Sequence, residues 1–233
     1  MTAQTADVEF YDARWRDRQG ELLRGIRLKR VAAIISEVSK LDQVDPDIIE
    51  LGCGFGTLSG MLRLVGNVTG IDQSPVAIEQ AKVSFPGVKF LAGDLFDAPL
   101  PRKTFNLVVS QEVIEHVDDQ AKFVELCHSL LRPRGYMILT TPNATIFHLS
   151  GKFETARNKG LLQPKENLLT VSQLRKLVRP EFEIIGCSTI APGGHRGALR
   201  VVNSPKLCRF KLWRALRSAL PFGLHTVIVA RAK

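Results

Sequence analysis

Short apolar runs alternate with amphipathic stretches through most of this chain. Five of these runs have the length of buried strands, and three of the intervals between them place apolar side chains at helical spacing. The candidate strands are residues 47–51, 67–72, 88–92, 105–110 and 136–140, and the candidate helices are residues 57–65, 75–84 and 119–131. Because parallel strands need crossover connections, this alternation predicts an α/β fold with a doubly wound, mostly parallel sheet.

Both ends of the chain extend this pattern. Residues 17–40 alternate charged and apolar groups at helical spacing, which predicts one long helix over the edge of the sheet. A short helix is expected at residues 171–179, and Pro180 ends it. Residues 182–190 and 224–230 predict two further strands, with a long insert between them.

The length and composition indicate a single domain over residues 1–233, since 45% of the residues are hydrophobic and supply a substantial core. No apolar run reaches the roughly 18 residues that span a bilayer. Residues 1–10 carry acids and no apolar stretch, so we expect no secretory signal. The four cysteines are scattered without a Cys-x-x-Cys pair, which argues against a zinc site and favours a reducing cytoplasm.

The net charge of +9 is concentrated at one end of the chain. Residues 1–183 hold 23 basic and 23 acidic residues, whereas the last fifty residues hold nine basic residues and no acid. This asymmetry predicts an anionic partner for the C-terminal segment, such as a phosphate, a lipid head group or a nucleic acid.

A glycine-rich turn follows the first candidate strand, where residues 48–56 read Ile-Ile-Glu-Leu-Gly-Cys-Gly-Phe-Gly. Glycines allow a sharp turn and a close approach of the backbone to a ligand. Asp72 closes the next apolar run sixteen residues after the last of these glycines, where its carboxylate can accept hydrogen bonds from two ribose hydroxyls. Glu50 lies two residues before the first glycine, and a carboxylate there suits an amine and a sulfonium better than a diphosphate.

At these residues the chain resembles the Rossmann-like S-adenosylmethionine (SAM) methyltransferases, whose first motif is an acid followed by Gly-x-Gly-x-Gly. The resemblance runs from about residue 47 to residue 233 and implies a seven-stranded sheet with an antiparallel last strand. It also implies SAM as the cofactor and S-adenosyl-L-homocysteine as its product. An NAD(P)-binding oxidoreductase is the alternative from another class, and both Glu50 and the glycine spacing speak against it.

The resemblance implies cofactor contacts beyond the glycine turn. In the family, an acid after the third strand holds the adenine amino group and the next backbone amide holds a ring nitrogen. Asp94 and Leu95 match these positions, Gln73 is expected to reach the adenine or the ribose, and residues 110–111 are expected beneath the methionine part. The implied cofactor-binding residues are Glu50, Gly52, Cys53, Gly54, Gly56, Asp72, Gln73, Asp94, Leu95, Ser110 and Gln111.

Two acids and a histidine follow the fourth candidate strand. On a helix, Glu112, Glu115 and His116 fall at i, i+3 and i+4 and share one face. The ubiquinone-biosynthesis O-methyltransferases carry a similar Glu-His pair near the acceptor. This resemblance implies His116 as the general base for an acceptor hydroxyl, with Glu112 or Glu115 positioning it. The alternative is that the Glu-His pair only caps and orients a helix.

The same three residues also resemble a metal motif. The small-RNA 3′-terminal 2′-O-methyltransferases bind a divalent metal through Glu-x-x-Glu-His and a later histidine, and Glu112, Glu115 and His116 match the first part. The comparable later stretch, residues 163–170, contains no histidine. We therefore expect no metal, and a metal-assisted RNA ribose methyltransferase is the alternative function.

Two flanking segments are candidates for contacts with the acceptor. Residues 7–40 are expected to form a helical lid whose N-terminal part is rich in aromatics, although these aromatics equally suit simple docking. Residues 191–223 form a basic helical insert, in which Arg209, Arg214 and Arg217 lie opposite an apolar helix face. A helix with solvated charges and an interfacial membrane helix both fit this pattern, and a nucleic-acid contact fits it less well.

We conclude from the sequence that the chain is a SAM-dependent methyltransferase acting on a hydroxyl of a small-molecule, lipid-linked or glycan-linked acceptor. We expect it in the cytoplasm, peripheral to the inner face of a membrane. The cofactor motifs are shared by enzymes that methylate oxygen, nitrogen or carbon, so they do not identify the methylated atom. A non-catalytic SAM-binding subunit would carry the same motifs.

Overall fold

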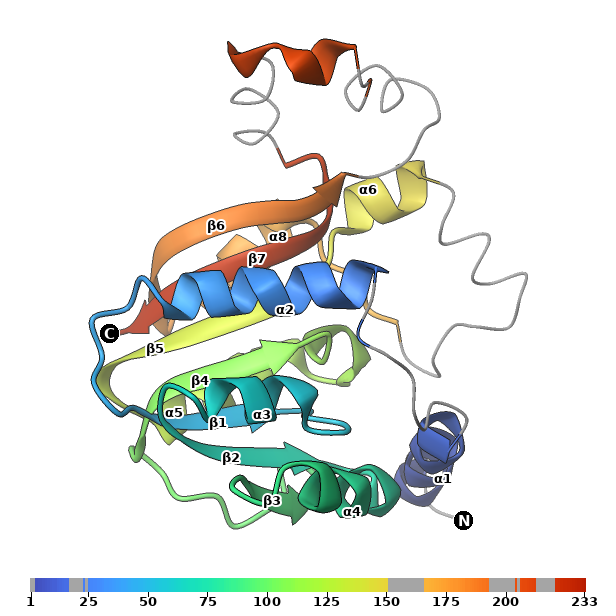
Figure 1. The fold of residues 1–233 in the computed structure, drawn as a ribbon, viewed down its shortest axis with the longest axis vertical. Coiled ribbons are helices and arrows are strands. Elements are labelled where there is room, and N and C mark those ends of the chain that lie inside the picture. Colours follow the sequence, from blue (N-terminus) through green and yellow to red (C-terminus); the bar gives the residue numbers. More distant parts are fainter. Residues whose placement is uncertain are drawn as a thin grey trace.

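The computed structural model describes residues 3–16, 23, 25–150, 166–192, 204, 206–212 and 221–233. Seven strands form one sheet in the order β3-β2-β1-β4-β5-β7-β6 (Figure 1). The strands are β1 (Asp47–Leu51), β2 (Asn67–Asp72), β3 (Lys89–Ala92), β4 (Phe105–Gln111), β5 (Leu131–Pro142), β6 (Phe182–Pro192) and β7 (Gly223–Ala232). Strands β1 to β5 pair in parallel, whereas β7 is antiparallel to both β5 and β6. The predicted fold class and the antiparallel last strand are therefore confirmed.

Helices cover both faces of this sheet. They are α1 (Ala3–Arg16), α2 (Gly25–Val38), α3 (Thr57–Leu62), α4 (Pro75–Ser84), α5 (Gln120–Leu130), α6 (Ala144–Leu149) and α8 (Val171–Val178), with 3-10 turns η1 (Ile114–His116) and η2 (Leu207–Arg209). In Figure 1, α2, α3 and α4 lie on one face and α5 and α8 on the other, while α1 lies beyond the carboxyl ends of the strands. Parallel sheets bind ligands at the edge formed by the carboxyl ends of their strands, and in this fold α1 lies next to that edge.

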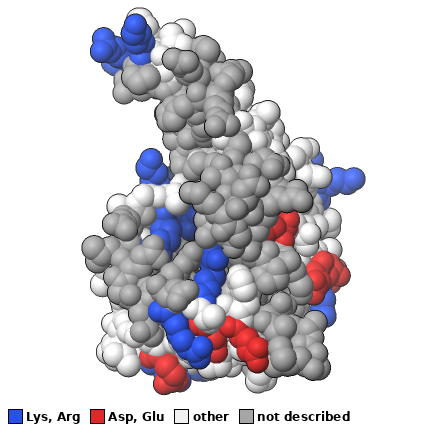
Figure 2. All heavy atoms as spheres, turned by 90° about the vertical axis from the view of Figure 1, so that its right-hand side faces the viewer, with Lys and Arg blue, Asp and Glu red and all other residues white. Residues whose placement is uncertain are grey.

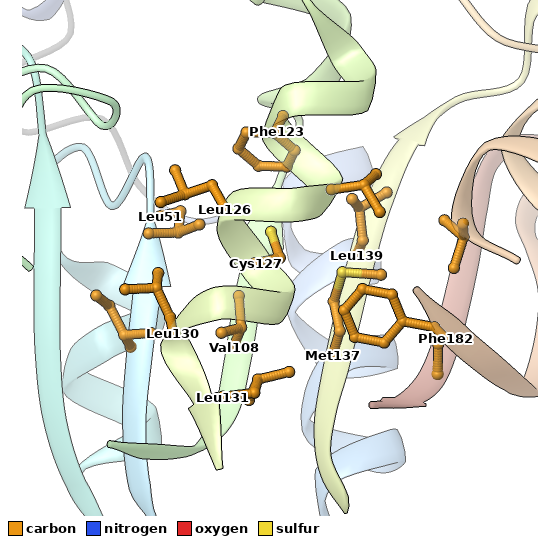
Figure 3. Packing of buried hydrophobic residues seen from close by; sticks show 14 of the residues in the cluster. Leu51, Val108, Phe123, Leu126, Cys127, Leu130, Leu131, Met137, Leu139 and Phe182 are labelled. Carbon is orange, nitrogen blue, oxygen red and sulfur yellow. The ribbon is translucent and has the colours of Figure 1, made fainter. Parts of the chain in front are cut away.

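Alternating residues of each central strand supply two separate hydrophobic cores. Ile48 and Leu107 face α2, α3 and α4, whereas their neighbours Ile49 and Val108 face α5 and α8. Figure 3 shows the second core, in which α5 side chains, including Phe123 and Cys127, pack against β1, β4 and β5. Burial on both faces explains why the strands read as continuous apolar runs.

The structure corrects the expected helices at two places. Residues 17–40 do not form one long helix, because α2 begins only at Gly25, which has a φ of 59°, and Leu23 is not helical. Residues 111–117 are not a regular helix either. Glu112 has a φ of 59°, outside the helical range, and it turns the backbone out of the direction of β4 before the short turn η1 begins.

The basic insert lies mostly outside the described residues, including Arg214 and Arg217. Its described part contains η2 and stands away from the sheet at the top of Figure 1. Across the described helices, none combines the length and the hydropathy needed to cross a bilayer.

Replacing Phe123 with Ala tests the second core. The Phe123 side chain is fully buried, so its truncation should lower the free energy of unfolding by about 3–5 kcal/mol. The matched control Val83→Ala removes a side chain from a residue that is 78% exposed and should change the stability by less than about 0.5 kcal/mol. Urea denaturation followed by circular dichroism measures both values. Equal losses in the two variants would contradict this packing.

Candidate active site

One large pocket lies at the carboxyl ends of the strands. It has a volume of about 830 Å³, within the range of ligand sites. Its walls come from α1, α2, the glycine turn after β1, the ends of β2 to β4, and the start of β7. In the order of the sheet, the pocket extends from Asp94 after β3 to His225 on β7.

Backbone hydrogen bonds to β2 shape the glycine turn. The N–H groups of Gly52 and Cys53 both donate to the carbonyl of Ile71, over 2.8 and 3.0 Å. The Gly54 N–H donates to Oδ2 of Asp72 over 2.8 Å. Gly52 and Gly54 have φ values of 74° and 52°, a region that favours glycine. The turn therefore keeps its shape because the ends of β1 and β2 are joined directly.

The glycines of the turn have different neighbours. A side chain at Gly54 would collide with the indole of Trp15, which packs on Phe55 with ring centroids 4.6 Å apart. Gly52, Cys53 and Gly54 line the pocket. Gly56 is not among the residues that line it, so its cofactor contact stays a prediction. Its missing side chain instead makes room for the ring of Phe90, at the start of α3.

Glu50 lines the pocket but is almost wholly buried, at 2% exposure. Burial raises its pKa to about 8, although a 2.5 Å hydrogen bond from the Ser59 hydroxyl acts in the opposite direction. The carboxyl group is therefore largely neutral at pH 7 in the ligand-free protein, and a nearby cation would favour its ionised form.

Asp72 is also buried, and its pKa is raised for the same reason. Its second oxygen, Oδ1, accepts a 3.0 Å hydrogen bond from the Ser74 N–H. Each oxygen of an ionised carboxylate has a further lone pair, so the expected contact with ribose hydroxyls remains open. Asp72 and Gln73 both line the pocket. Ser74 in turn donates its hydroxyl to Asp12, which ties α1 to this end of the site.

Asp94 and Leu95 line the pocket next to Phe96, as expected for an adenine site. Oδ1 of Asp94 accepts a 2.8 Å hydrogen bond from the Phe96 N–H, which fixes the turn. Gln111 lines the pocket with its Oε1 buried, and this atom has no hydrogen-bond partner within the described part of the chain. Ser110 is excluded from the pocket: it is fully buried and donates to the carbonyl of Leu51. Its cofactor contact therefore stays a prediction.

Glu112 is the centre of a polar network that joins three strands and α2. Its Oε1 accepts from the Thr140 hydroxyl over 3.0 Å. Its Oε2 lies 3.3 Å from Nη1 of Arg30 and 2.8 Å from Nδ1 of His225. Burial acts to raise the pKa of Glu112, but the charges of Arg30 and His225 outweigh it and the net pKa is lowered. Glu112 is therefore ionised at neutral pH.

Glu115 points to a different part of the pocket wall. It is buried and accepts a 2.9 Å hydrogen bond from the Thr141 hydroxyl. Burial, and then the charge of Glu112, raise its pKa well above the usual range. Nε2 of His116 lies 3.7 Å from Oε1 of Glu115, beyond hydrogen-bond distance. Glu112, Glu115 and His116 all line the pocket, but they do not share a helix face, and the histidine in contact with Glu112 is His225.

Sequence reasoning missed Arg30, Thr140, Thr141 and His225. Arg30 is one of several basic residues on α2, and the two threonines lie within an apolar strand. Nothing in the local sequence therefore marked them as residues of the site. His225 offered a weak one, as a lone ionisable residue near the start of an apolar strand. Within the described ranges there is no group of three or more His, Cys, Asp or Glu that could hold a metal.

The lining of the pocket fits SAM, the cofactor that the resemblance implies. Two glycines without side chains bring the backbone close, and Gln111 offers a buried acceptor with no partner in the described residues. Burial raises the pKa of the Glu50 and Asp72 carboxyl groups, and a sulfonium and an amine would favour their ionised forms. Glu50, Asp72, Gln73, Asp94 and Gln111 are the side chains that would hold the cofactor.

Replacing Glu50 with Gln tests the burial of this carboxyl group. Because its folded pKa lies near 8 and its ordinary value is 4.5, the folded protein holds a proton that the unfolded chain releases between these two values. Stability therefore falls as the pH rises from about 4.5 to about 8. Glu50→Gln removes this loss, so its melting temperature should exceed that of the wild type by at least about 2–4 °C at pH 8, and by much less at pH 5.

Differential scanning calorimetry across this pH range measures the effect. The control Glu79→Gln alters a side chain that is 73% exposed and should follow the wild type at every pH. A Glu50→Gln protein that is less stable than the wild type at pH 8 would contradict the raised pKa.

Known proteins match this chain in sequence and in fold. A family model described as a methyltransferase domain matches residues 49–139. A probable SAM-dependent methyltransferase of Mycolicibacterium smegmatis is 36% identical over 102 residues, which cover 43% of this chain and 40% of the relative. A ubiquinone biosynthesis O-methyltransferase of Pseudomonas aeruginosa is 31% identical over 162 residues, covering 64% of this chain and 68% of that protein.

Solved structures share the whole architecture. A SAM-dependent methyltransferase of Thermotoga maritima, described as a possible histamine N-methyltransferase, superposes with a TM-score of 0.64 over 88% of this chain and 89% of its own, at 19% identity. A putative methyltransferase from Haloferax volcanii, in complex with its activator, gives a TM-score of 0.68 over 97% of this chain and 96% of its own, at 17% identity. The chain thus belongs to the SAM-dependent methyltransferases and uses S-adenosyl-L-methionine as its cofactor.

Proposed function

We propose that this enzyme methylates a hydroxyl group on a small or lipid-linked acceptor. The supporting observation is the lining of the pocket at its β7 end, past Glu112. Leu23 and Ile26, Phe147 of α6, and Leu224 of β7 make this end apolar. An apolar wall of this kind suits an acceptor with a ring or an isoprenoid-like chain. The relatives named for O-methylation favour oxygen as the methylated atom.

The protein's part in this reaction is alignment and proton removal. When bound, the cofactor supplies a methyl group that its sulfonium already activates. The chain must hold the acceptor oxygen in line with that methyl group and keep water out. The Trp15 indole, which packs over Gly54, and Tyr11 line the pocket from α1, as the proposed lid requires. His116 and His225 both line the pocket and are candidates to receive the hydroxyl proton.

A second observation supports a lipid-linked acceptor. The described tip of the basic insert exposes Phe210 by 65% and Leu212 by 74%, beside Lys206, Arg209 and Lys211. Figure 2 shows basic side chains gathered at this tip, whereas the acids visible in this view lie on the lower half of the molecule. Exposed apolar groups among cations suit the surface of an anionic bilayer. We propose that the protein binds the cytoplasmic face of a membrane through this tip, with Arg214 and Arg217 adding to its charge.

Tritiated SAM tests the reaction directly. The pure protein is incubated with host extract divided into lipid, RNA and small-molecule fractions, with and without EDTA. We expect label to appear in the lipid or small-molecule fraction whether or not EDTA is present. The label should also resist mild alkali, because an ether does. Label in RNA that EDTA abolishes would instead support a metal-assisted ribose methyltransferase. Alkali-labile label would indicate methylation of a carboxylate and contradict the proposal.

Flotation with phosphatidylglycerol-containing vesicles tests the tip. Each basic residue near an anionic surface contributes about 1 kcal/mol, so replacing Lys206, Arg209 and Lys211 with Glu should weaken binding on the order of 100-fold or more. The control replaces Lys40, Lys82 and Lys89 with Glu and makes the same change in net charge on other exposed surfaces. Equal loss in both variants, or a wild type that never floats, would contradict a specific membrane contact.

A further inference from the structure

We propose that His225, positioned by Glu112, is the general base that takes the proton from the acceptor hydroxyl. The inference rests on the proposed O-methylation and assigns to His225 the role that the sequence predicts for His116. It is carried by the contacts of the Glu112 carboxylate, which accepts hydrogen bonds from Arg30 and Thr140 and lies 2.8 Å from Nδ1 of His225 at the pocket wall.

The first step concerns which nitrogen of His225 carries the proton. Nδ1 lies 2.8 Å from Oε2 of Glu112, which is ionised and can only accept hydrogen bonds. Among the described residues no partner of Nδ1 satisfies hydrogen-bond geometry, but a contact this short with an ionised oxygen is favourable only if Nδ1 carries a hydrogen. When the imidazole is neutral, its lone pair is therefore on Nε2, as in other carboxylate–histidine pairs.

The second step concerns where this lone pair can act. His225 lines the pocket, and its imidazole has Glu112 as its polar side-chain contact in the described part of the chain. Leu224 and Phe147 flank the same region of the pocket, which is where an apolar acceptor would bind. His225 is therefore at the acceptor end of the pocket, and the proposal requires its Nε2 to face the acceptor.

The third step concerns stabilisation of the charge that forms. When His225 receives a proton it becomes a cation, and an ionised carboxylate at 2.8 Å stabilises it. Thr140 and Arg30 fix the same carboxylate, and Arg30 keeps it ionised before the proton arrives. The network therefore holds both the orientation of the ring and the charge that supports it.

The contact between His116 and Glu115 is longer. Nε2 of His116 is 3.7 Å from Oε1 of Glu115, and burial raises the pKa of that carboxyl group well above its usual range. A carboxyl group whose ionisation burial opposes stabilises an imidazolium less at 3.7 Å than an ionised carboxylate does at 2.8 Å. The comparison of the two histidines thus favours His225.

The reaction balances with this assignment. A lone pair of the acceptor oxygen forms the new C–O bond, and the electrons of the broken C–S bond remain on sulfur, which becomes a neutral thioether. The electrons of the acceptor O–H bond stay on oxygen, and the proton passes to Nε2 of His225. One positive charge is lost from the sulfonium and one appears on the imidazolium, beside Glu112.

Two measurements test the proposal independently. The first is long-range ¹H–¹⁵N NMR of histidine-labelled protein without any acceptor, with the His225 signal assigned through His225→Asn. We expect the Nδ1–H tautomer in the wild type and a shift toward Nε2–H in Glu112→Gln, because the ionised acceptor is lost. An Nε2–H tautomer in the wild type would overturn the pairing, whatever the activity.

The second measurement is the rate of methyl transfer to the fraction of host extract that the wild type labels. His225→Asn should lower this rate by about 10²–10⁴-fold, the usual contribution of a general base, while SAM affinity measured by calorimetry changes less than about threefold. The matched variant His116→Asn should lower it less than about tenfold. Added imidazole should partly restore His225→Ala, which a purely structural role would not allow.

The outcomes separate the proposal from the function on which it rests. A wild-type rate in folded His225→Asn, or a larger loss in His116→Asn, would overturn the role of His225. A wild type that labels no fraction would overturn the proposed O-methylation instead, and the NMR tautomer would still decide the Glu112–His225 pairing. If His225→Asn does not fold, the tautomer of the wild type and imidazole rescue of His225→Ala remain decisive.

Discussion

The structure depends on how four carboxyl groups are buried at the carboxyl edge of one sheet. Glu50, Asp72, Glu112 and Glu115 all lie at the ends of neighbouring strands or just beyond them, and all line the same pocket. Desolvation opposes the ionised form of each. Of these four, Glu112 lies close to Arg30 and His225, and its pKa is the one that is lowered. The edge is therefore set up to receive a cation.

This constraint divides the pocket into two functional halves. Toward β2 and β3, burial raises the pKa of the carboxyl groups beside the glycine turn, and no basic side chain in the described part of the chain lowers it, so these groups suit a cationic cofactor. Toward β5 and β7, the charge of Glu112 is already matched by Arg30, and His225 contacts the same carboxylate. An acceptor bound at that end would contact the Glu112–His225 pair and an apolar wall. The two halves meet near Gln111, between the ends of β1 and β5.

Sequence reasoning found the parts that local pattern determines. The bounds of β1, β2 and α4 match the expected ranges, because Pro75 and the apolar runs between turns are strong local signals. The residues of the glycine motif and its partner acids likewise line one pocket, whereas Ser110 and Gly56 are buried outside its lining. Motif spacing does not show which residues a tertiary fold will bury.

The acceptor end could not be predicted in the same way. Its network joins α2, β4, β5 and β7, and residues 30 and 225 lie far apart in the chain. Helical spacing placed Glu112 beside Glu115 and His116, but the positive φ of Glu112 turns it toward His225 instead. No local pattern indicates that turn, which depends on the tertiary contacts with Arg30 and Thr140.

The most direct measurement is a crystal structure of the protein with S-adenosyl-L-homocysteine. The account predicts adenine beside Asp94 and Leu95, ribose at Asp72, and the sulfur directed toward the end of the pocket that holds Glu112 and His225, with Nε2 of His225 facing the space beyond it. A sulfur directed away from His225, or an Nε2 that faces the protein interior, would contradict the division of the pocket into these two halves.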